Sequence, residues 1–256
     1  MKKILLILLF VSLSYSFSEN AREPYRVGEY LKYRVHFGFM NAGYATLHLR
    51  EDYLYGEPVY HAIGKGWTVG AADFFFSIED RYESVFTRGE QVKPLHFIRR
   101  VNEGGYIISR DLFFDHEAGS VLIHDHKKNT KKRVEVSGVQ DLVSAFYYLR
   151  NLDLDQIRQG DEIRVDLFFD GEIFPFKLKF LNRETVKTKA GEINTWKVRP
   201  LVQKGRVFEG QESLTVWISD DENKVPIRIK ASLVVGSLKA DLDEYAGLAY
   251  PLNAVE

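Results

Sequence analysis

The segment Leu31-Lys32-Tyr33-Arg34-Val35-His36-Phe37 decides the fold class, because its apolar and polar residues alternate. Successive side chains of a β-strand point to opposite faces of a sheet, so this alternation indicates a strand with one buried and one solvated face. The same period of two returns at residues 45–50, 81–86, 225–230 and 238–243. We therefore expect most of the chain to form half-solvated strands.

Short turn signals separate these strands, among them Asn41-Ala42-Gly43, Gly104-Gly105, Asp170-Gly171 and Ala190-Gly191. Glycine, asparagine and aspartate tolerate the positive φ angles that tight hairpins require. Parallel strands would need long crossover connections, and the chain leaves little room for them. The sequence therefore predicts a mostly β fold, with a strongly curved antiparallel sheet or an open β-barrel.

Residues 141–152 break the alternation near the middle of the chain. Their apolar residues Leu142, Val143, Phe146 and Leu149 are spaced by three and four, which is typical of an amphipathic helix. We expect this one helix to pack on a face of the sheet or to plug the mouth of the curved sheet.

The N-terminus has the pattern of a secretory signal peptide. Lys2 and Lys3 precede an apolar run at residues 4–13, and Ser16-Phe17-Ser18 offers small residues for a signal peptidase. The apolar run is shorter than the roughly 20 residues that a membrane-spanning helix needs. We expect cleavage after Ser18 and a periplasmic or secreted protein without an integral membrane span.

Composition limits the remaining possibilities. The chain has 35 basic and 36 acidic residues and a formal charge of −1, which argues against a nucleic-acid partner. It has no cysteine, so its stability must come from a hydrophobic core rather than from disulfides. All-β proteins of this length often form one domain, and we expect residues 19–256 to do so.

Several short motifs, taken in their order along the chain, resemble the DUF3108 family of bacterial exported proteins of unknown function. The motifs are GEYLKY at 28–33, AGYA at 42–45, DFF at 73–75, DRYES at 80–84, DLVSAFYYLR at 141–150 and WISDD at 217–221. They extend over nearly the whole chain beyond the expected signal peptide. The resemblance implies an exported, β-rich fold without an assigned chemistry, and it supplies no catalytic residues.

No motif of the sequence predicts catalysis or metal binding. His124 and His126 should share one face of a strand, about 6.6 Å apart along it. A zinc site needs three or four ligands, and the following Lys127 and Lys128 would repel a cation. The spacings of a nucleophile elbow and of a phosphate-binding loop are also missing. We expect no enzymatic activity, no metal and no cofactor.

Aromatic residues are the remaining signal, with 18 Phe, 14 Tyr and 3 Trp in the chain. Such residues fill a core or line an apolar pocket. We expect the run Phe74-Phe75-Phe76 to fill the core, with a place under the helix or at the lip of a cavity as the alternatives. The candidate ligand-binding residues are Trp67, Phe75, Tyr82, Phe86 and Phe146.

Together these features favour a non-catalytic carrier or binding module of the envelope. A curved sheet with a helix over its concave face can hold an apolar small molecule, a lipid or a lipid-linked envelope precursor. One alternative is an assembly protein that binds an envelope protein through exposed aromatic residues. Another is a polysaccharide-acting enzyme, with Trp67 and Trp217 stacking on sugars. An outer-membrane barrel shows the same alternation, but the helix and the absence of a C-terminal aromatic residue weigh against it.

Overall fold

The computed structural model describes residues 23–89, 91–201, 213–234 and 236–255, so the expected signal peptide at residues 1–18 lies outside the described residues. The described residues form fifteen strands and two short helices. In chain order these are β1 (Tyr30–Phe37), β2 (Met40–Leu54), β3 (Glu57–Thr68), α1 (Gly70–Phe75), β4 (Glu79–Thr87), β5 (Pro94–Glu103), β6 (Tyr106–Asp115), β7 (Ser120–Asp125), β8 (Thr130–Glu135), α2 (Leu142–Arg150), β9 (Glu162–Phe169), β10 (Glu172–Thr188), β11 (Gly191–Leu201), β12 (Leu214–Ser219), β13 (Pro226–Ser232), β14 (Ser237–Ala246) and β15 (Ala254–Val255).

The strands form one antiparallel sheet. Their order is β8-β7-β6-β5-β4-β3-β2-β1-β14-β13-β12-β11-β10-β9, with β15 paired to β11. Consecutive strands pair as hairpins on both sides of the point where β14 returns to lie beside β1. Because β8 and β9 remain at the two edges, the sheet of the described strands is not closed. This arrangement confirms the predicted curved antiparallel sheet.

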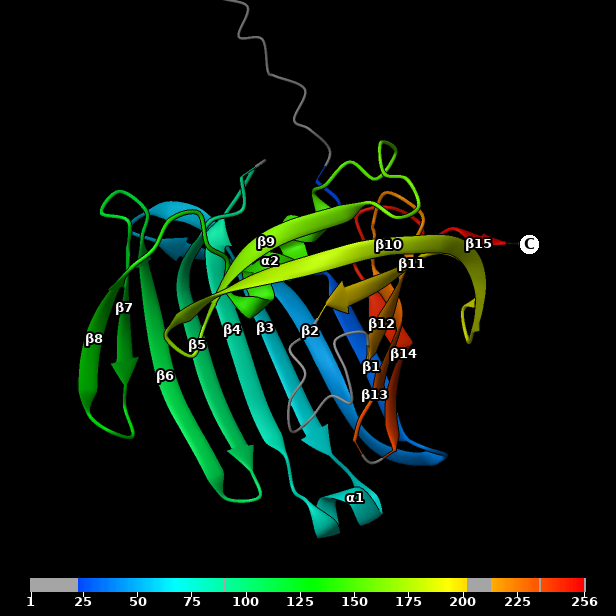
Figure 1. Ribbon diagram of the computed structural model, residues 1–256, viewed down its shortest axis with the longest axis horizontal. Coiled ribbons are helices and arrows are strands. Elements are labelled where there is room, and N and C mark those ends of the chain that lie inside the picture. The colour runs from blue at the N-terminus through cyan, green and yellow to red at the C-terminus, as the bar shows by residue number, and fades with distance from the viewer. Residues whose placement is uncertain (1–22, 90, 202–212, 235, 256) are drawn as a thin grey trace, which may run out of the picture.

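Helix α2 lies on the concave side of the sheet, between β9 and the pair β3–β4 (Figure 1). It begins at a capping box, in which the carboxylate of Asp141 accepts the backbone N–H groups of Val143 and Ser144 at 2.8 Å each. The hydroxyl of Ser84 on β4 also donates to this carboxylate at 2.6 Å. The predicted mid-chain helix is confirmed, and its first turn is bonded directly to the sheet.

One face of α2 completes the largest cluster of the core. Tyr147 is fully buried, and its ring lies 5.0 Å from that of Phe86 on β4 and 4.8 Å from that of Tyr25. Aromatic pairs at such distances stabilise a core beyond the area that they bury. The helix therefore fills the concave space on the side of β3–β7. Its other face points toward β9–β13.

The expectation that Phe74-Phe75-Phe76 fills the core is wrong. Phe74 and Phe75 lie in α1 and are 86% and 81% exposed, and Phe76 is also exposed. Gly70 adopts a φ of +58°, which ends the extended backbone of β3. The hydroxyl of Thr68 then donates to the carboxylate of Asp73, and this local bond competes with continuation of the strand.

Candidate functional site

An apolar cavity of about 270 Å³ lies between α2 and the concave face of β9–β13. Almost all the side chains that line it are apolar, and the two exceptions are Arg150 and Lys224. The lining residues are Leu142, Ala145, Phe146, Leu149, Arg150, Leu152, Leu154, Leu167, Phe176, Leu178, Phe180, Val198, Pro200, Val216, Ile218, Lys224, Pro226 and Ile229. This composition is typical of sites that hold hydrocarbon groups.

The register of the strands explains why the wall of this cavity is continuous. Phe180 on β10 pairs with Val198 on β11, which pairs with Val216 on β12, which pairs with Ile229 on β13. Residues directly opposite each other on neighbouring strands point to the same face of a sheet. These four apolar side chains therefore form one row across four strands, and the row faces the helix.

The helix contributes the opposite wall. Leu142, Ala145, Phe146 and Leu149 follow each other at spacings of three, one and three, so they lie on one face of α2. Ala145 is small, and its short side chain leaves space that a larger residue would fill. Leu142 is 38% exposed and Phe146 is half-buried, so this face is less fully covered than the Tyr147 face.

Two cations lie at one end of the cavity. The guanidinium of Arg150 is buried and binds both carboxylate oxygens of Glu29, at 2.6 and 2.7 Å. It also donates to the backbone carbonyl oxygens of Asn223 and Pro24. Arg150 is therefore occupied by the protein itself. The ammonium of Lys224 donates to the carbonyl oxygen of Arg150 at 3.0 Å, and burial lowers the pKa of Lys224.

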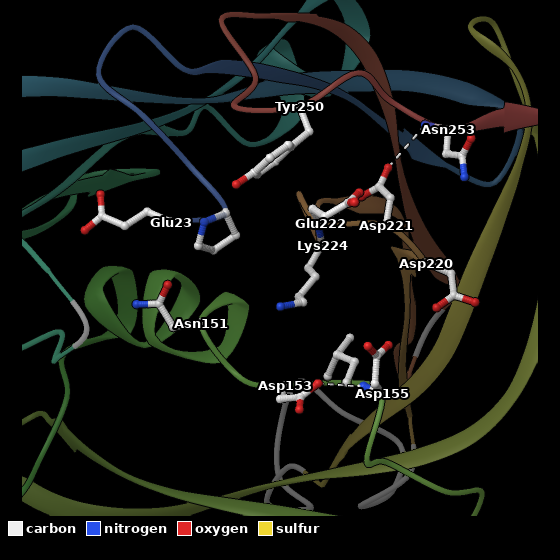
Figure 2. A pocket seen from close by; sticks show the side chains of 12 residues that line it. Glu23, Asn151, Asp153, Asp155, Asp220, Asp221, Glu222, Lys224, Tyr250 and Asn253 are labelled. Atoms are coloured by element: carbon white, nitrogen blue, oxygen red, sulfur yellow. Dashed lines mark hydrogen bonds between the residues drawn. The ribbon is translucent and has the colours of Figure 1, made fainter. Parts of the chain in front are cut away.

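A second cavity, of about 710 Å³, lies beyond this end, and we call it the acidic cavity. Figure 2 shows acidic, amide and aromatic side chains around it, drawn from the N-terminal segment, the segment after α2, the β12–β13 loop and the C-terminal segment. Its lining residues are Glu23, Pro24, Asn151, Asp153, Leu154, Asp155, Asp220, Asp221, Glu222, Lys224, Tyr250 and Asn253. Leu154 and Lys224 line both cavities, so they mark the boundary between them.

The carboxylates of the acidic cavity also have a structural role. Asp221 accepts the hydroxyl of Ser219 and the backbone N–H groups of Asn223, Lys224 and Asn253. These bonds shape the β12–β13 loop and bind it to the C-terminal segment, as the dashed line in Figure 2 shows for Asn253. Among the described residues, no group of three or more potential ligands could hold a metal ion.

The structure brings one of the five candidate ligand-binding residues, Phe146, to the apolar cavity. Phe86 is fully buried against Tyr147 in the core, and Tyr82 is half-buried with its ring 6.3 Å from that of Phe97. The binding role assigned to Phe86 and Tyr82 stays a prediction.

The other two candidates lie apart from the cavity. Trp67 is half-buried near the end of β3, where its ring lies 5.9 Å from that of Tyr44. Phe75 is exposed on α1. Neither residue lines the cavity that Phe146 lines. Their binding role likewise stays a prediction.

Sequence reasoning missed the sheet side of the cavity. The run Phe176-Lys177-Leu178-Lys179-Phe180 carries a clear alternation, and its three apolar residues all line the cavity. That alternation could have marked them as inward-facing. Their assignment to the wall opposite α2 required the order of the strands.

His124 lies in β7 and His126 in the turn after it, so the prediction that both lie on one strand is wrong, although their ring centroids are only 4.0 Å apart. His126 pairs with the carboxylate of Asp111 at 2.7 Å, and Asp111 also binds Arg100. These contacts belong to a network of charges on the surface of the sheet.

Fold and site together define a β-barrel-like protein, in which an open antiparallel sheet curves around a helix and leaves an apolar cavity beneath it. The chain belongs to the DUF3108 family, whose model, described as a protein of unknown function, matches residues 32–243. The motifs in the sequence predicted this membership.

Comparison with one solved structure agrees with the fold. A beta-barrel-like protein of the domain of unknown function DUF1849 from Brucella abortus is similar, with a TM-score of 0.56 and 11% identity over 86% of this chain and 98% of that chain. A protein with a YmcC-like fold from Bacteroides fragilis matches 87% of this chain and 97% of its own, at 9% identity and a TM-score of 0.35. At these identities the likeness concerns the fold alone. No curated protein matches the chain.

The two described helices are both too short to cross a membrane.

Proposed function

We propose that this chain is a non-catalytic carrier or binding module of the cell envelope, which holds an apolar ligand in the cavity between α2 and β9–β13. The observation that carries the proposal is the cavity wall, in which only Arg150 and Lys224 interrupt the apolar lining. Removing hydrocarbon from water into such a site is favourable by roughly 25 cal/mol for each Å² buried. The signal pattern at residues 1–18 supports a place in the envelope.

The size of the cavity narrows the class of ligand. Its volume of about 270 Å³ lies just below the range of about 300–1,000 Å³ that is usual for small-molecule sites. A single hydrocarbon chain suits this space better than a whole two-chain lipid. The ligand is therefore a molecule with one acyl or prenyl chain, or a larger lipid that inserts one chain.

Filling the cavity with protein should abolish binding. Val216 lies in the middle of the apolar row, and Val216→Trp places an indole in the space that the ligand would occupy. We expect the dissociation constant of a fluorescent single-chain fatty acid, 11-(dansylamino)undecanoic acid, to rise at least tenfold in this variant. The measurement is a fluorescence titration of the chain from residue 19 onward.

Thr215→Trp provides the matched control. Thr215 is the neighbour of Val216 on β12, so its side chain points to the opposite face of the sheet. This variant should bind the fatty acid like the wild type, and urea unfolding should show that both variants are folded. Equal affinity of Val216→Trp and wild type, or no saturable binding by the wild type, would contradict the proposal.

A further inference from the structure

Exposed aromatic and aliphatic side chains gather on turns at one end of the sheet. They lie on the β1–β2 turn, on α1 and the segment after it, on the β5–β6 turn and on the β13–β14 turn. The most exposed of them are Phe39, Phe74, Phe75, Phe76, Tyr106 and Val234. We call these four segments the aromatic end.

The topology of the sheet brings these segments together. In an antiparallel meander every second connection lies at the same end, and these four connections are alternate ones in the sheet order β6-β5-β4-β3-β2-β1-β14-β13. Figure 1 shows α1 and the turns β1–β2 and β5–β6 at the lower end of the molecule, where β13 ends and β14 begins. Four turns that are distant in sequence thus form one surface.

Contacts between the turns hold this surface in place. The ring of Phe76 lies against Gly104, where an added Cβ would come within 3.0 Å of the ring, and Gly104 donates its N–H to the carbonyl oxygen of Ser77. The ring of Phe37 lies against Gly236 in the same way, and Gly38 donates to the carbonyl oxygen of Ser237. The turns therefore support each other in pairs while the outer rings remain exposed.

The charges beside the aromatic end include two lysines. Lys127 and Lys128 lie on the β7–β8 turn, which is another alternate connection, and the ammonium of Lys127 lies 3.4 Å from the carbonyl oxygen of Ile107. The acids on the same connections are Asp73, Glu79, Asp80 and Glu103. Asp73 and Asp80 accept hydrogen bonds from the hydroxyl of Thr68 and the backbone N–H of Asn102, and Glu103 is half-buried. Lysines next to exposed aromatic residues match the anionic head groups and acyl boundary of a bilayer.

We propose that the aromatic end docks on the surface of a lipid bilayer, with Phe39, Phe74 and Phe75 entering the interface. The exposed rings lie on separate turns that project from the sheet. A fluid bilayer can close around each ring, whereas a rigid protein surface would have to match all of them at once. Aromatic rings are favoured at the level of the lipid head groups. The inference goes beyond ligand binding in the cavity and does not depend on it.

The test is co-sedimentation of the chain from residue 19 onward with vesicles of phosphatidylethanolamine and phosphatidylglycerol. The double variant Phe74→Ser with Phe75→Ser removes two rings that are almost fully exposed, so its fold should be unchanged. The bound fraction at a fixed lipid concentration gives the partition coefficient. We expect the partition coefficient of this variant to be at least tenfold below that of the wild type.

The control removes aromatic residues from the other end of the sheet. Tyr53 lies near the end of β2 and Tyr55 in the β2–β3 turn, and they are 64% and 98% exposed, so Tyr53→Ser with Tyr55→Ser removes comparable exposed surface. This control should bind vesicles like the wild type. The proposal is overturned if the wild type does not sediment with vesicles, or if the Phe74/Phe75 variant and the control bind equally well. Thermal unfolding of both variants shows that neither result comes from misfolding.

Discussion

Replacing Arg150 by methionine is expected to lower the free energy of unfolding by about 3–5 kcal/mol, the usual cost of leaving one partner of a buried ion pair alone. The side chains of Arg150 and Glu29 are only 3% and 1% exposed, and two hydrogen bonds of 2.6 and 2.7 Å join them. The substitution would leave a carboxylate in the core without a counter-charge. It would also remove the donors to Pro24 and Asn223.

Urea unfolding measures this loss of free energy, and two further variants serve as its controls. Lys32→Met removes a partly exposed partner of Glu244 and should lower the free energy of unfolding far less than Arg150→Met does. Combining Arg150→Met with Glu29→Leu removes both buried charges and should recover part of the stability. A loss below 1 kcal/mol for Arg150→Met alone would show that the pair is not buried in solution.

The Asp141 carboxyl should lower the free energy of unfolding of the wild type as the pH rises from about 4 to about 6. Burial raises the pKa of the Asp141 carboxyl to about 6, although hydrogen bonds from Ser84, Ser144 and Val143 oppose the shift. Between the usual pKa of 3.8 and about 6, the folded state binds more protons than the unfolded state. Stability then declines with rising pH, by roughly 3 kcal/mol at most for this group.

Asp141→Asn should remove this decline, because asparagine keeps a cap acceptor for α2 and does not titrate. The measurement compares the free energy of unfolding of the two proteins by urea at pH 4, 5, 6 and 7. Other titrating groups contribute equally to both proteins and cancel in the difference. The variant should gain stability relative to the wild type across this interval. A difference that stays constant with pH would mean that the Asp141 carboxyl is ionised throughout.

Local patterns in the sequence predicted α2 and the strands at residues 31–37, 45–50, 81–86, 225–230 and 238–243. The turn predicted at Asn41-Ala42-Gly43 is wrong, because these residues lie in β2 and the chain turns at residues 38–39. The alternation at residues 31–37 became β1, and the apolar spacing at residues 141–152 became α2 with its Asp141 cap. Local patterns failed at residues 74–76, because three consecutive phenylalanines fit a buried strand as well as a short exposed helix such as α1. The positive φ of Gly70 and the side-chain bond of Thr68 favour the end of β3 and the start of α1, and neither is evident from hydrophobicity.

The site was less predictable than the fold, because it depends on contacts between distant strands. Phe146 could be selected from its place on the helix, and it lines the cavity. Val198, Val216 and Ile229 lie on the consecutive strands β11, β12 and β13, which pair with one another. These strands lie opposite Phe146 because β14 returns beside β1 and joins them to the same curved sheet. Nothing in the local sequence specifies that pairing.

The most direct test of the central claim, that the apolar cavity holds a ligand, is native mass spectrometry of the chain after purification from an envelope extract without detergent. The account predicts a stoichiometric adduct of a single-chain or lipid-like molecule that is lost on denaturation. The adduct should be absent from Val216→Trp and present in Thr215→Trp. A bare wild-type chain, or an adduct that Val216→Trp retains in full, would contradict the account.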